Sequence, residues 1–398
     1  MEKATRQYTK EHNRNLVLRT IFSHENISRA EIARISRLTR TTVSEIVSSL
    51  IQEGLVSEVG IGQSRGGKNP IMLSLEEDSR WIIALDLGQN QFRGAVVNLR
   101  GKIREIVSTP IDDRDGAEAL KQVFQMLDSL ISFSSQKISG IGVGAPGLIN
   151  SNEGMVVRAV NLNWNNVPLE KLLQDRYQLP VYILNDCQAA AIGEKTYSSI
   201  FRQNENLVVI KAHHGIGSGI IINDSVFVGD GGFAGEIGHI VVQRENGQLC
   251  RCGNRGCLET VASTQSLINK ARKEIGKHTR SSIPKESRKI TLESIEAAFK
   301  AGDPFARSLV LENARYIGKA ISSLVGIMNI QTIVISGNLT CFGEPWLEEI
   351  RNEMMHYSLE LPLKTTTVNF GELGDNATIL GAAAVFVNNY SSLFIKDR

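Results

Sequence analysis

The run Cys250-Arg-Cys252-Gly-Asn-Arg-Gly-Cys257 contains three of the five cysteines of this 398-residue chain. His239 lies eleven positions before the first of them. Three thiolates and one imidazole form a closed tetrahedral shell that suits Zn²⁺, and a shell with no open position stabilises structure and does not itself catalyse. We therefore predict a structural zinc site with His239, Cys250, Cys252 and Cys257 as its ligands.

Two other uses of these cysteines remain open, a disulfide and a redox pair. A disulfide needs an oxidising compartment. The polar, charged N-terminus shows no secretory signal, so we expect a cytoplasmic protein. A redox Cys-x-x-Cys more often lies beside a strand-helix turn. Zinc is the preferred interpretation, and the isolated Cys187 and Cys341 are expected to be ordinary buried thiols.

The predicted zinc ion would join two segments that each carry a carboxylate. Gly235-Glu236-Ile-Gly238-His239 precedes the cysteines, and Leu258-Glu259-Thr260 follows them. One ion bound by both segments would bring Glu236 and Glu259 together. Both could instead be surface charges, but their position on either side of the metal ligands favours a shared pocket.

The length of the chain indicates two or three domains, and the distribution of charge gives them different character. Residues 1–75 carry eleven Lys and Arg against seven Glu and no Asp, a net charge of +4, whereas the whole chain carries only +2. A basic head on a slightly acidic body is typical of a nucleic-acid-binding module joined to something else. No apolar run is long enough to suggest a membrane span.

The basic head has the pattern of a winged helix-turn-helix. Ser28 and Glu31 form a capping box before the second helix, and Thr39 caps the third. We expect the second helix to bury Ala30, Ile32, Ala33 and Ile35. The predicted elements are helices over 15–22, 29–35 and 40–53 and strands over 55–60 and 70–75.

The third helix and the wing carry the groups that would contact DNA. Short polar or cationic side chains at the start of that helix can reach base edges and phosphates in the major groove. Two cations at the tip of the wing suit phosphate or minor-groove contact. The predicted DNA-binding residues are Arg40, Thr41, Thr42, Ser44, Arg65 and Lys68. A three-helix protein-interaction module with a surface hairpin is the alternative.

From Arg80 onward, apolar strands repeatedly end in Gly-rich or Asn/Asp turns before helices, which predicts an α/β fold with ligand groups at strand ends. Asn185-Asp186 is the strongest such pair, because an amide beside a carboxylate can bind adjacent hydroxyls. The pair could also cap the Ala-rich helix that follows, and one side chain could do each. Asn161 is either a turn former or a ligand contact.

Together these residues resemble the ROK family of repressors and sugar kinases, most closely its repressors, from the head through Ala382. The motifs are Gly142-x-Gly144-Ala-Pro-Gly147, Asn185-Asp186, Gly235-Glu236-x-Gly238-His239 and the cysteine run with Glu259. The resemblance implies a two-lobed, actin-like (ribonuclease-H-like) body with a sugar in its cleft. It implies that sugar hydroxyls are held by Asn185, Asp186, Glu236, His239 and Glu259. Asn161 is our further candidate for sugar binding.

The chain departs from the kinases of that family in both phosphate loops. Asp86-Leu-Gly88-Gln-Asn90 stands where the kinases have Asp-x-Gly-x-Thr, and His213-His214-Gly215 stands where they have Gly-Thr-Gly. Phosphoryl transfer depends on positioning and electrostatics around the phosphates. We therefore expect no enzyme activity, although Asp186 would be the catalytic base if the chain were a kinase. His213 and His214 could be plain loop residues or a gate.

We expect a sugar-responsive transcriptional repressor of carbohydrate-utilisation genes that binds operator DNA as a homodimer or homotetramer. The predicted domains are the head, 1–78, and a ROK body, 79–398, with a small lobe over about 79–184 plus the C-terminal helix and a large lobe over about 185–380. An ATP-dependent sugar kinase with an appended DNA-binding domain is the alternative, and control by a partner protein is a third possibility. The sugar, the operator sequence and the direction of the response stay open.

Overall fold

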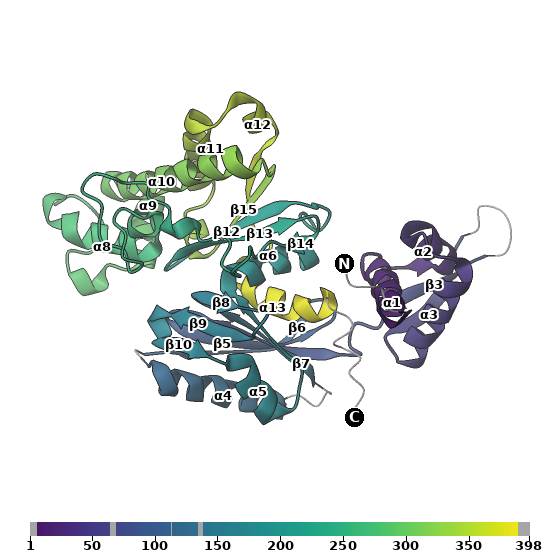
Figure 1. Ribbon diagram of the computed structural model, residues 1–398. Coiled ribbons are helices and arrows are strands. Elements are labelled where there is room, and N and C mark those ends of the chain that lie inside the picture. Colours follow the sequence, from purple (N-terminus) through teal and green to yellow (C-terminus); the bar gives the residue numbers. More distant parts are fainter. Residues whose placement is uncertain (1–5, 64–68, 113, 134–137, 389–398) are drawn as a thin grey trace. The chain divides into compact units, whose positions relative to one another are not determined.

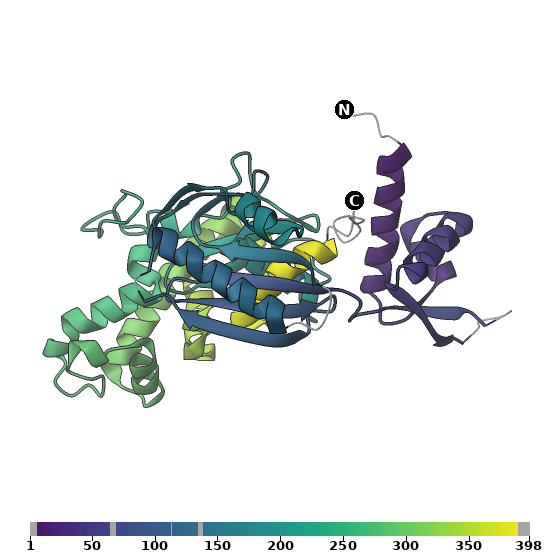
Figure 2. The same ribbon diagram turned by 90° about the horizontal axis from the view of Figure 1, so that it is seen from below.

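The computed structural model describes residues 6–63, 69–112, 114–133 and 138–388 (Figures 1 and 2). The chain divides into two compact units. One contains residues 1–143, 168–183 and 382–398, and the other contains residues 144–167 and 184–381. All predicted metal ligands and sugar-binding residues therefore belong to the second unit.

The first unit begins with three helices and a small sheet in the strand order β1-β3-β2. The order predicted for a winged helix-turn-helix is observed, although the first helix begins at Arg6, earlier than its apolar periodicity indicated. The elements are α1 (Arg6–Phe22), β1 (Ile27–Ser28), α2 (Arg29–Ser36), α3 (Arg40–Gln52), β2 (Val56–Ile61) and β3 (Ile71–Leu75).

Both predicted helix caps in the head are present. The Glu31 N–H donates to Ser28 Oγ at 3.3 Å, and the Ser28 N–H donates to the Glu31 carboxylate at 3.0 Å. The Thr42 N–H donates to Thr39 Oγ1 at 3.2 Å. These bonds satisfy N–H groups that have no partner inside a helix, and they fix where α2 and α3 begin.

The prediction that α2 buries four apolar residues is wrong for two of them. Ile32 and Ala33 are buried, whereas Ala30 is exposed and Ile35 is 45% exposed. A helix of this length presents only a narrow stripe to its neighbours, so residues outside the stripe stay in solvent.

The rest of the first unit is built on a five-stranded sheet in the order β11-β7-β4-β5-β6. The predicted hairpin of β4 and β5 is antiparallel, with Trp81 opposite Asn98 and Leu87 opposite Phe92. β7 and β11 continue into the second unit at their C-terminal ends. The elements are β4 (Trp81–Leu87), β5 (Gln91–Asn98), β6 (Ile103–Pro110), α4 (Gly116–Phe133), β7 (Ile138–Ala145), α5 (Leu169–Tyr177) and β11 (Val181–Asn185).

The second unit is built on a sheet in the order β14-β13-β12-β15-β16, with β12 antiparallel to β13 and parallel to β15. The strands are β12 (Leu207–Ala212), β13 (Ile216–Ile222), β14 (Ser225–Val226), β15 (Thr332–Ser336) and β16 (Thr367–Phe370). A small sheet contains β8 (Leu148–Asn150), β9 (Met155–Ala159) and β10 (Trp164–Val167).

The second unit also contains helices, of which α6 packs against β12 and β13. They are α6 (Asp186–Tyr197), α7 (Leu258–Ala262), α8 (Thr264–Glu274), α9 (Leu292–Lys300), α10 (Pro304–Met328), α11 (Glu344–Tyr357), α12 (Glu360–Thr365) and α13 (Ala377–Asn388), the last of which continues into the first unit. Within the described residues, we find no helix with the length and apolar character that crossing a bilayer requires.

The long helix α10 forms the centre of the apolar core of the second unit. Trp346 of α11 is fully buried, and its Nε1 donates to Asn313 Oδ1 of α10 at 3.0 Å. Asn313 Nδ2 donates in turn to the carbonyl oxygen of Ala262 at 2.7 Å. The core is thereby joined to the last residue of α7, the helix that follows the cysteines.

Candidate functional site

The four predicted metal ligands lie together in the structure. Their ligand atoms, one imidazole nitrogen and three sulfurs, are all within 4.8 Å of one another. Cys250 Sγ is 3.6 Å from His239 Nδ1, and Cys252 Sγ is 3.6 Å from Cys257 Sγ. Ligands of one tetrahedral zinc ion would be separated by roughly 3.5–3.8 Å, given Zn–S and Zn–N lengths of about 2.3 and 2.0 Å. The donor set and its spacing therefore fit a metal ion.

The two glycines of the segment Gly235–His239 explain how Glu236 reaches this site. A Cβ atom on Gly235 would lie 2.0 Å from the Ser218 carbonyl oxygen, and one on Gly238 would lie 2.0 Å from the Ile216 carbonyl oxygen. Only glycine allows so close an approach of two backbones. The segment therefore packs directly on β13, which fixes Glu236 and His239.

Glu236 is the carboxylate most affected by its surroundings. Burial, together with the negative charges of Asp186 and Glu259, raises its pKa to about 7. Its Oε2 lies 3.7 Å from His239 Nε2, on the other side of the imidazole from the cysteines. The structure thus brings Asp186 and Glu259 close enough to Glu236 for their charges to act on it.

Glu259 has a structural partner that the sequence did not indicate. Its Oε2 accepts a hydrogen bond from the Ile216 N–H at 3.1 Å, and its Oε1 lies 3.5 Å from Arg251. Arg251 lies in the sequence between two of the predicted metal ligands, Cys250 and Cys252, and Ile216 is the first residue of β13. Glu259 therefore connects the cysteine segment to the turn between β12 and β13.

Asn185 caps α6, the alternative that the sequence left open. Its Oδ1 accepts from the Cys187 and Gln188 N–H groups at 2.9 and 3.2 Å, and its Nδ2 donates to the Gly147 carbonyl oxygen at 3.0 Å. Asp186, the first residue of α6, is oriented by this cap. Direct contact of either side chain with a sugar stays a prediction.

Lys211 is a residue of this site that sequence analysis missed. Its Nζ lies 2.8 Å from Asp186 Oδ2 and 3.0 Å from Thr378 Oγ1. A lysine inside the apolar strand Leu207–Ala212 was the available signal, because a charge in a central strand needs a buried partner. Without knowledge of the strand order, that partner could not be named.

Asn161 lies in a short 3₁₀ turn, Val160–Leu162. Its Nδ2 is buried and has no hydrogen-bond partner within the described part of the chain. Buried amide donors in native proteins are nearly always paired, so this atom is available to a bound molecule. Its role as a sugar contact stays a prediction.

The two histidines lie in a tight turn between β12 and β13, because β12 ends at Ala212 and β13 begins at Ile216. The His213 N–H donates to the Gly215 carbonyl oxygen at 3.0 Å, and the two imidazole rings lie 5.1 Å apart. Burial and the neighbouring Lys211 lower the pKa of His213 to about 3, and burial lowers that of His214. Both rings are therefore neutral at pH 7.

In the head, the residues predicted to contact DNA lie at the start of α3. Arg40, Thr41 and Ser44 are exposed, whereas Thr42 is half-buried and its hydroxyl lies 2.9 Å from that of Thr39. The opposite face of α3 is buried through Val43, Val47 and Leu50. The two predicted wing contacts, Arg65 and Lys68, lie outside the described residues.

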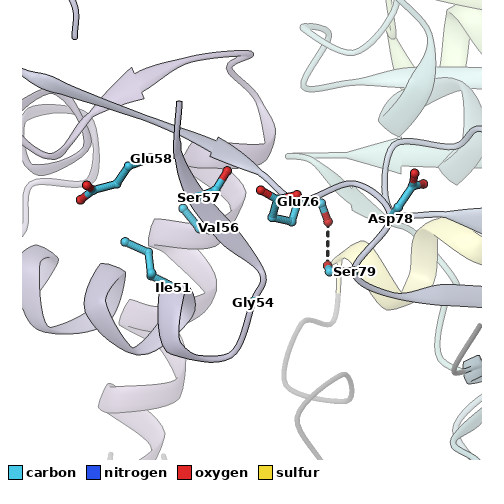
Figure 3. A pocket seen from close by; sticks show the side chains of 8 residues that line it. All are labelled: Ile51, Gly54, Val56, Ser57, Glu58, Glu76, Asp78 and Ser79. Carbon is cyan, nitrogen blue, oxygen red and sulfur yellow. Dashed lines mark hydrogen bonds between the residues drawn. The ribbon is translucent and has the colours of Figure 1, made fainter. Parts of the chain in front are cut away.

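An open hollow of about 830 Å³ lies beside the other end of α3 (Figure 3). Three carboxylates, those of Glu58, Glu76 and Asp78, line it, and the Ser79 hydroxyl donates to the Glu76 carbonyl oxygen at 2.6 Å. Carboxylates repel phosphate, so this hollow does not belong to the predicted DNA-binding surface.

Comparison with known proteins matches two families to two parts of the chain. The ROK family profile matches residues 82–389, and the MarR family profile matches residues 11–58. A xylose repressor of Caldicellulosiruptor bescii is 34% identical over 390 residues, which are 96% of this chain and 97% of that protein. A glucokinase of Halalkalibacterium halodurans is 33% identical over 309 residues, 76% of this chain and 93% of the enzyme.

One solved structure is similar to this chain over nearly its whole length. The crystal structure of a ROK family transcriptional regulator, a homologue of the E. coli Mlc protein, has a TM-score of 0.84 and 27% identity and covers 97% of this chain and 98% of its own. The expected winged head and actin-like body are thereby confirmed. The chain belongs to the ROK family, and it resembles the repressors of that family over nearly its whole length.

Proposed function

We propose that this protein is a sugar-responsive transcriptional repressor of carbohydrate-utilisation genes. The observation that carries the proposal is the presence in one chain of a helix-turn-helix head and a ROK body, together with similarity to a xylose repressor over nearly the whole length of both chains. The glucokinase relative covers 76% of this chain, whereas the xylose repressor covers 96%, which favours the repressor over the kinase. The proposal includes the predicted domain boundary, with the head ending at residue 78 and the ROK body beginning at residue 79.

In this proposal the head binds operator DNA through the start of α3 and the wing, with Arg40, Thr41, Thr42, Ser44, Arg65 and Lys68 as contacts. Two heads on a homodimer or homotetramer would read two half-sites of a palindrome. A ligand changes operator affinity only if it binds one conformation better than the other. A coupling of about 1–3 kcal/mol would change that affinity about 5- to 150-fold.

The proposed ligand is a small carbohydrate held by Asn161, Asn185, Asp186, Glu236, His239 and Glu259. Carboxylate and amide oxygens accept hydrogen bonds from hydroxyls, and amide groups donate to them. We infer that Asn185 and Glu259 act mainly by orienting Asp186 and the turn before β13, since both side chains already have partners.

The metal in this proposal is a structural Zn²⁺ bound by His239, Cys250, Cys252 and Cys257. The ion would hold the segment Gly235–His239 next to α7 and so keep Glu236 and Glu259 in place. His239 would use Nδ1 for the metal, which leaves Nε2, the atom near Glu236, for a ligand hydroxyl.

The test is a titration of operator DNA in the presence of sugars. Duplexes selected by the protein from a random library would be titrated with D-xylose, D-glucose and other hexoses and pentoses. We expect one sugar to change the operator affinity at least fivefold, in line with the coupling above. If no sugar changes the affinity in either direction, regulation by this route is rejected.

Two controls separate the alternatives. Arg40→Gln should weaken operator binding, whereas Lys171→Gln, a change at an exposed lysine on α5, should not. ADP release measured with the same sugars distinguishes the kinase, because a repressor without phosphoryl transfer releases none. Steady turnover would favour the kinase.

A further inference from the structure

We propose that Lys211 fixes the position of Asp186, so that this carboxylate is oriented to accept a hydrogen bond from a hydroxyl of the ligand. The inference rests on the proposed function and deepens it, because it concerns the same site. Three side chains from three different elements carry it.

The geometry fixes Asp186 at two points. Lys211 Nζ, on β12, donates to Asp186 Oδ2 at 2.8 Å and to Thr378 Oγ1 at 3.0 Å. The Thr378 hydroxyl then donates its own proton to the Asp186 main-chain carbonyl oxygen at 3.3 Å. Lysine and threonine thus hold the side chain and the main chain of the first residue of α6 together.

Burial makes this ion pair stronger than a surface pair. The side chains of Lys211 and Asp186 are 15% and 20% exposed, and Thr378 is buried at the start of α13. At this depth solvent and salt screen the two charges less than at the surface. Removing one partner would leave the other charge half-buried and unpaired, which is costly.

The same contact suits Asp186 to recognition of a hydroxyl. A carboxylate oxygen is a strong acceptor of a hydrogen bond from a hydroxyl. Because Lys211 and Thr378 fix the position of Asp186, a hydroxyl that binds its carboxylate is held in one orientation.

The pair itself can be tested without a ligand by a double-mutant cycle in urea unfolding. The four proteins are the wild type, Lys211→Met, Asp186→Asn and the double variant. We expect each single change to lower the unfolding midpoint and the double variant to lose less than the two shifts together, since it leaves no unpaired charge. Additive shifts would overturn the claim that Lys211 holds Asp186.

Lys195→Met is the matched control for this experiment. Lys195 is also 15% exposed and is paired, with Asp224 at 2.5 Å, but it lies in the last turn of α6. A general cost of removing a half-buried lysine would appear equally in both variants. Only the Lys211 variant should also change sugar binding.

Sugar binding is then measured by titration calorimetry with D-xylose and D-glucose. We expect Lys211→Met to weaken binding of the sugar that the wild type binds by about tenfold or more, the effect of losing an oriented hydrogen bond to a charged group. Lys211→Arg should restore part of the loss, and Lys195→Met should bind as the wild type does. In the Asp186→Asn background, Lys211→Met should change affinity little further.

The outcomes separate the two proposals. Equal affinity of wild type and Lys211→Met would overturn this inference and leave the proposed function intact. Failure of the wild type to bind either sugar would count against the proposed function, and with it against a hydroxyl-binding role of the pair. The unfolding cycle would still decide whether the two side chains act together.

Discussion

The cysteine segment and the helical layer around α10 lie in the same unit but are stabilised in different ways. Around Cys250, Val241 and Leu249 are 45% and 64% exposed, and the segment is held by backbone hydrogen bonds beside four side chains that could bind a metal ion. Around α10, side chains such as Ile317 and Trp346 are fully buried. We infer that the site can be loosened by loss of a metal ion while the core that supports it stays folded.

The largest effect on stability is expected for Trp346→Ala, which removes a buried side chain from the layer around α10. Loss of a fully buried indole should reduce the free energy of unfolding by about 3–5 kcal/mol. Urea unfolding followed by circular dichroism measures it. Trp346→Phe keeps much of the ring, loses the hydrogen bond to Asn313 and should cost less. A loss below about 1 kcal/mol for the alanine variant would mean that this layer is not the main core.

The next largest effect on stability is expected for Cys252→Ser, which removes one of the four proposed metal ligands. Cys252 is exposed, so the change removes a ligand with little loss of packing. We expect loss of bound metal and of the sugar response together, faster hydrogen exchange over residues 239–263, and a stability loss of about 0.5–3 kcal/mol. Elemental analysis and exchange mass spectrometry measure these changes.

Cys341→Ser is the control for that variant, because Cys341 lies outside the ligand set. It should keep its metal and its exchange pattern. If Cys252→Ser lost its metal but bound sugar with unchanged affinity, the metal would not organise the site. The contrast between the two regions would then have no bearing on function.

A smaller effect is expected at Glu259, which joins the cysteine segment to β13. Glu259→Ala leaves the Ile216 N–H without its acceptor and should reduce the free energy of unfolding by about 1–2 kcal/mol. Glu259→Gln keeps an acceptor oxygen, so its loss should be smaller. Urea unfolding of both variants measures the difference. Equal losses would mean that the charge of Glu259, and not its hydrogen bond, matters.

The smallest effect is that of Asp303→Ala at the start of α10. Asp303 accepts from the Phe305 and Ala306 N–H groups, both at 2.9 Å, so its loss should cost about 1 kcal/mol. Burial alone would raise the pKa of Asp303, but hydrogen bonds from Ala306 and Ser282 outweigh burial and lower it to about 2.

This lowered pKa predicts how the effect of Asp303→Ala depends on pH. A carboxyl whose pKa is lower in the folded protein stabilises it above its ordinary pKa, and the contribution is lost as the pH falls through the folded value. The difference between wild type and Asp303→Ala should therefore be constant above about pH 4 and shrink toward pH 2. Unfolding midpoints over that range measure it, and a difference independent of pH would contradict the assignment.

Local patterns allowed much of this fold to be predicted. The caps at Ser28 and Thr39 and the cluster of cysteines are short-range signals, because the groups that interact lie within a few residues of one another. The partners of Lys211 and Glu259 are long-range. Asp186 lies 25 residues from Lys211, and Thr378 lies 167 residues from it. Only the strand order and the helix packing bring them together.

Gly215 offers a way to disconnect Glu259 without changing its charge. A methyl group at this position would lie 2.5 Å from Glu259 Oε2, the atom that accepts from Ile216, and no backbone atom stands in its way. Alanine there should therefore displace a flexible carboxylate and leave the chain path intact. A single added carbon atom at position 215 would therefore separate the hydrogen bond of Glu259 from its charge.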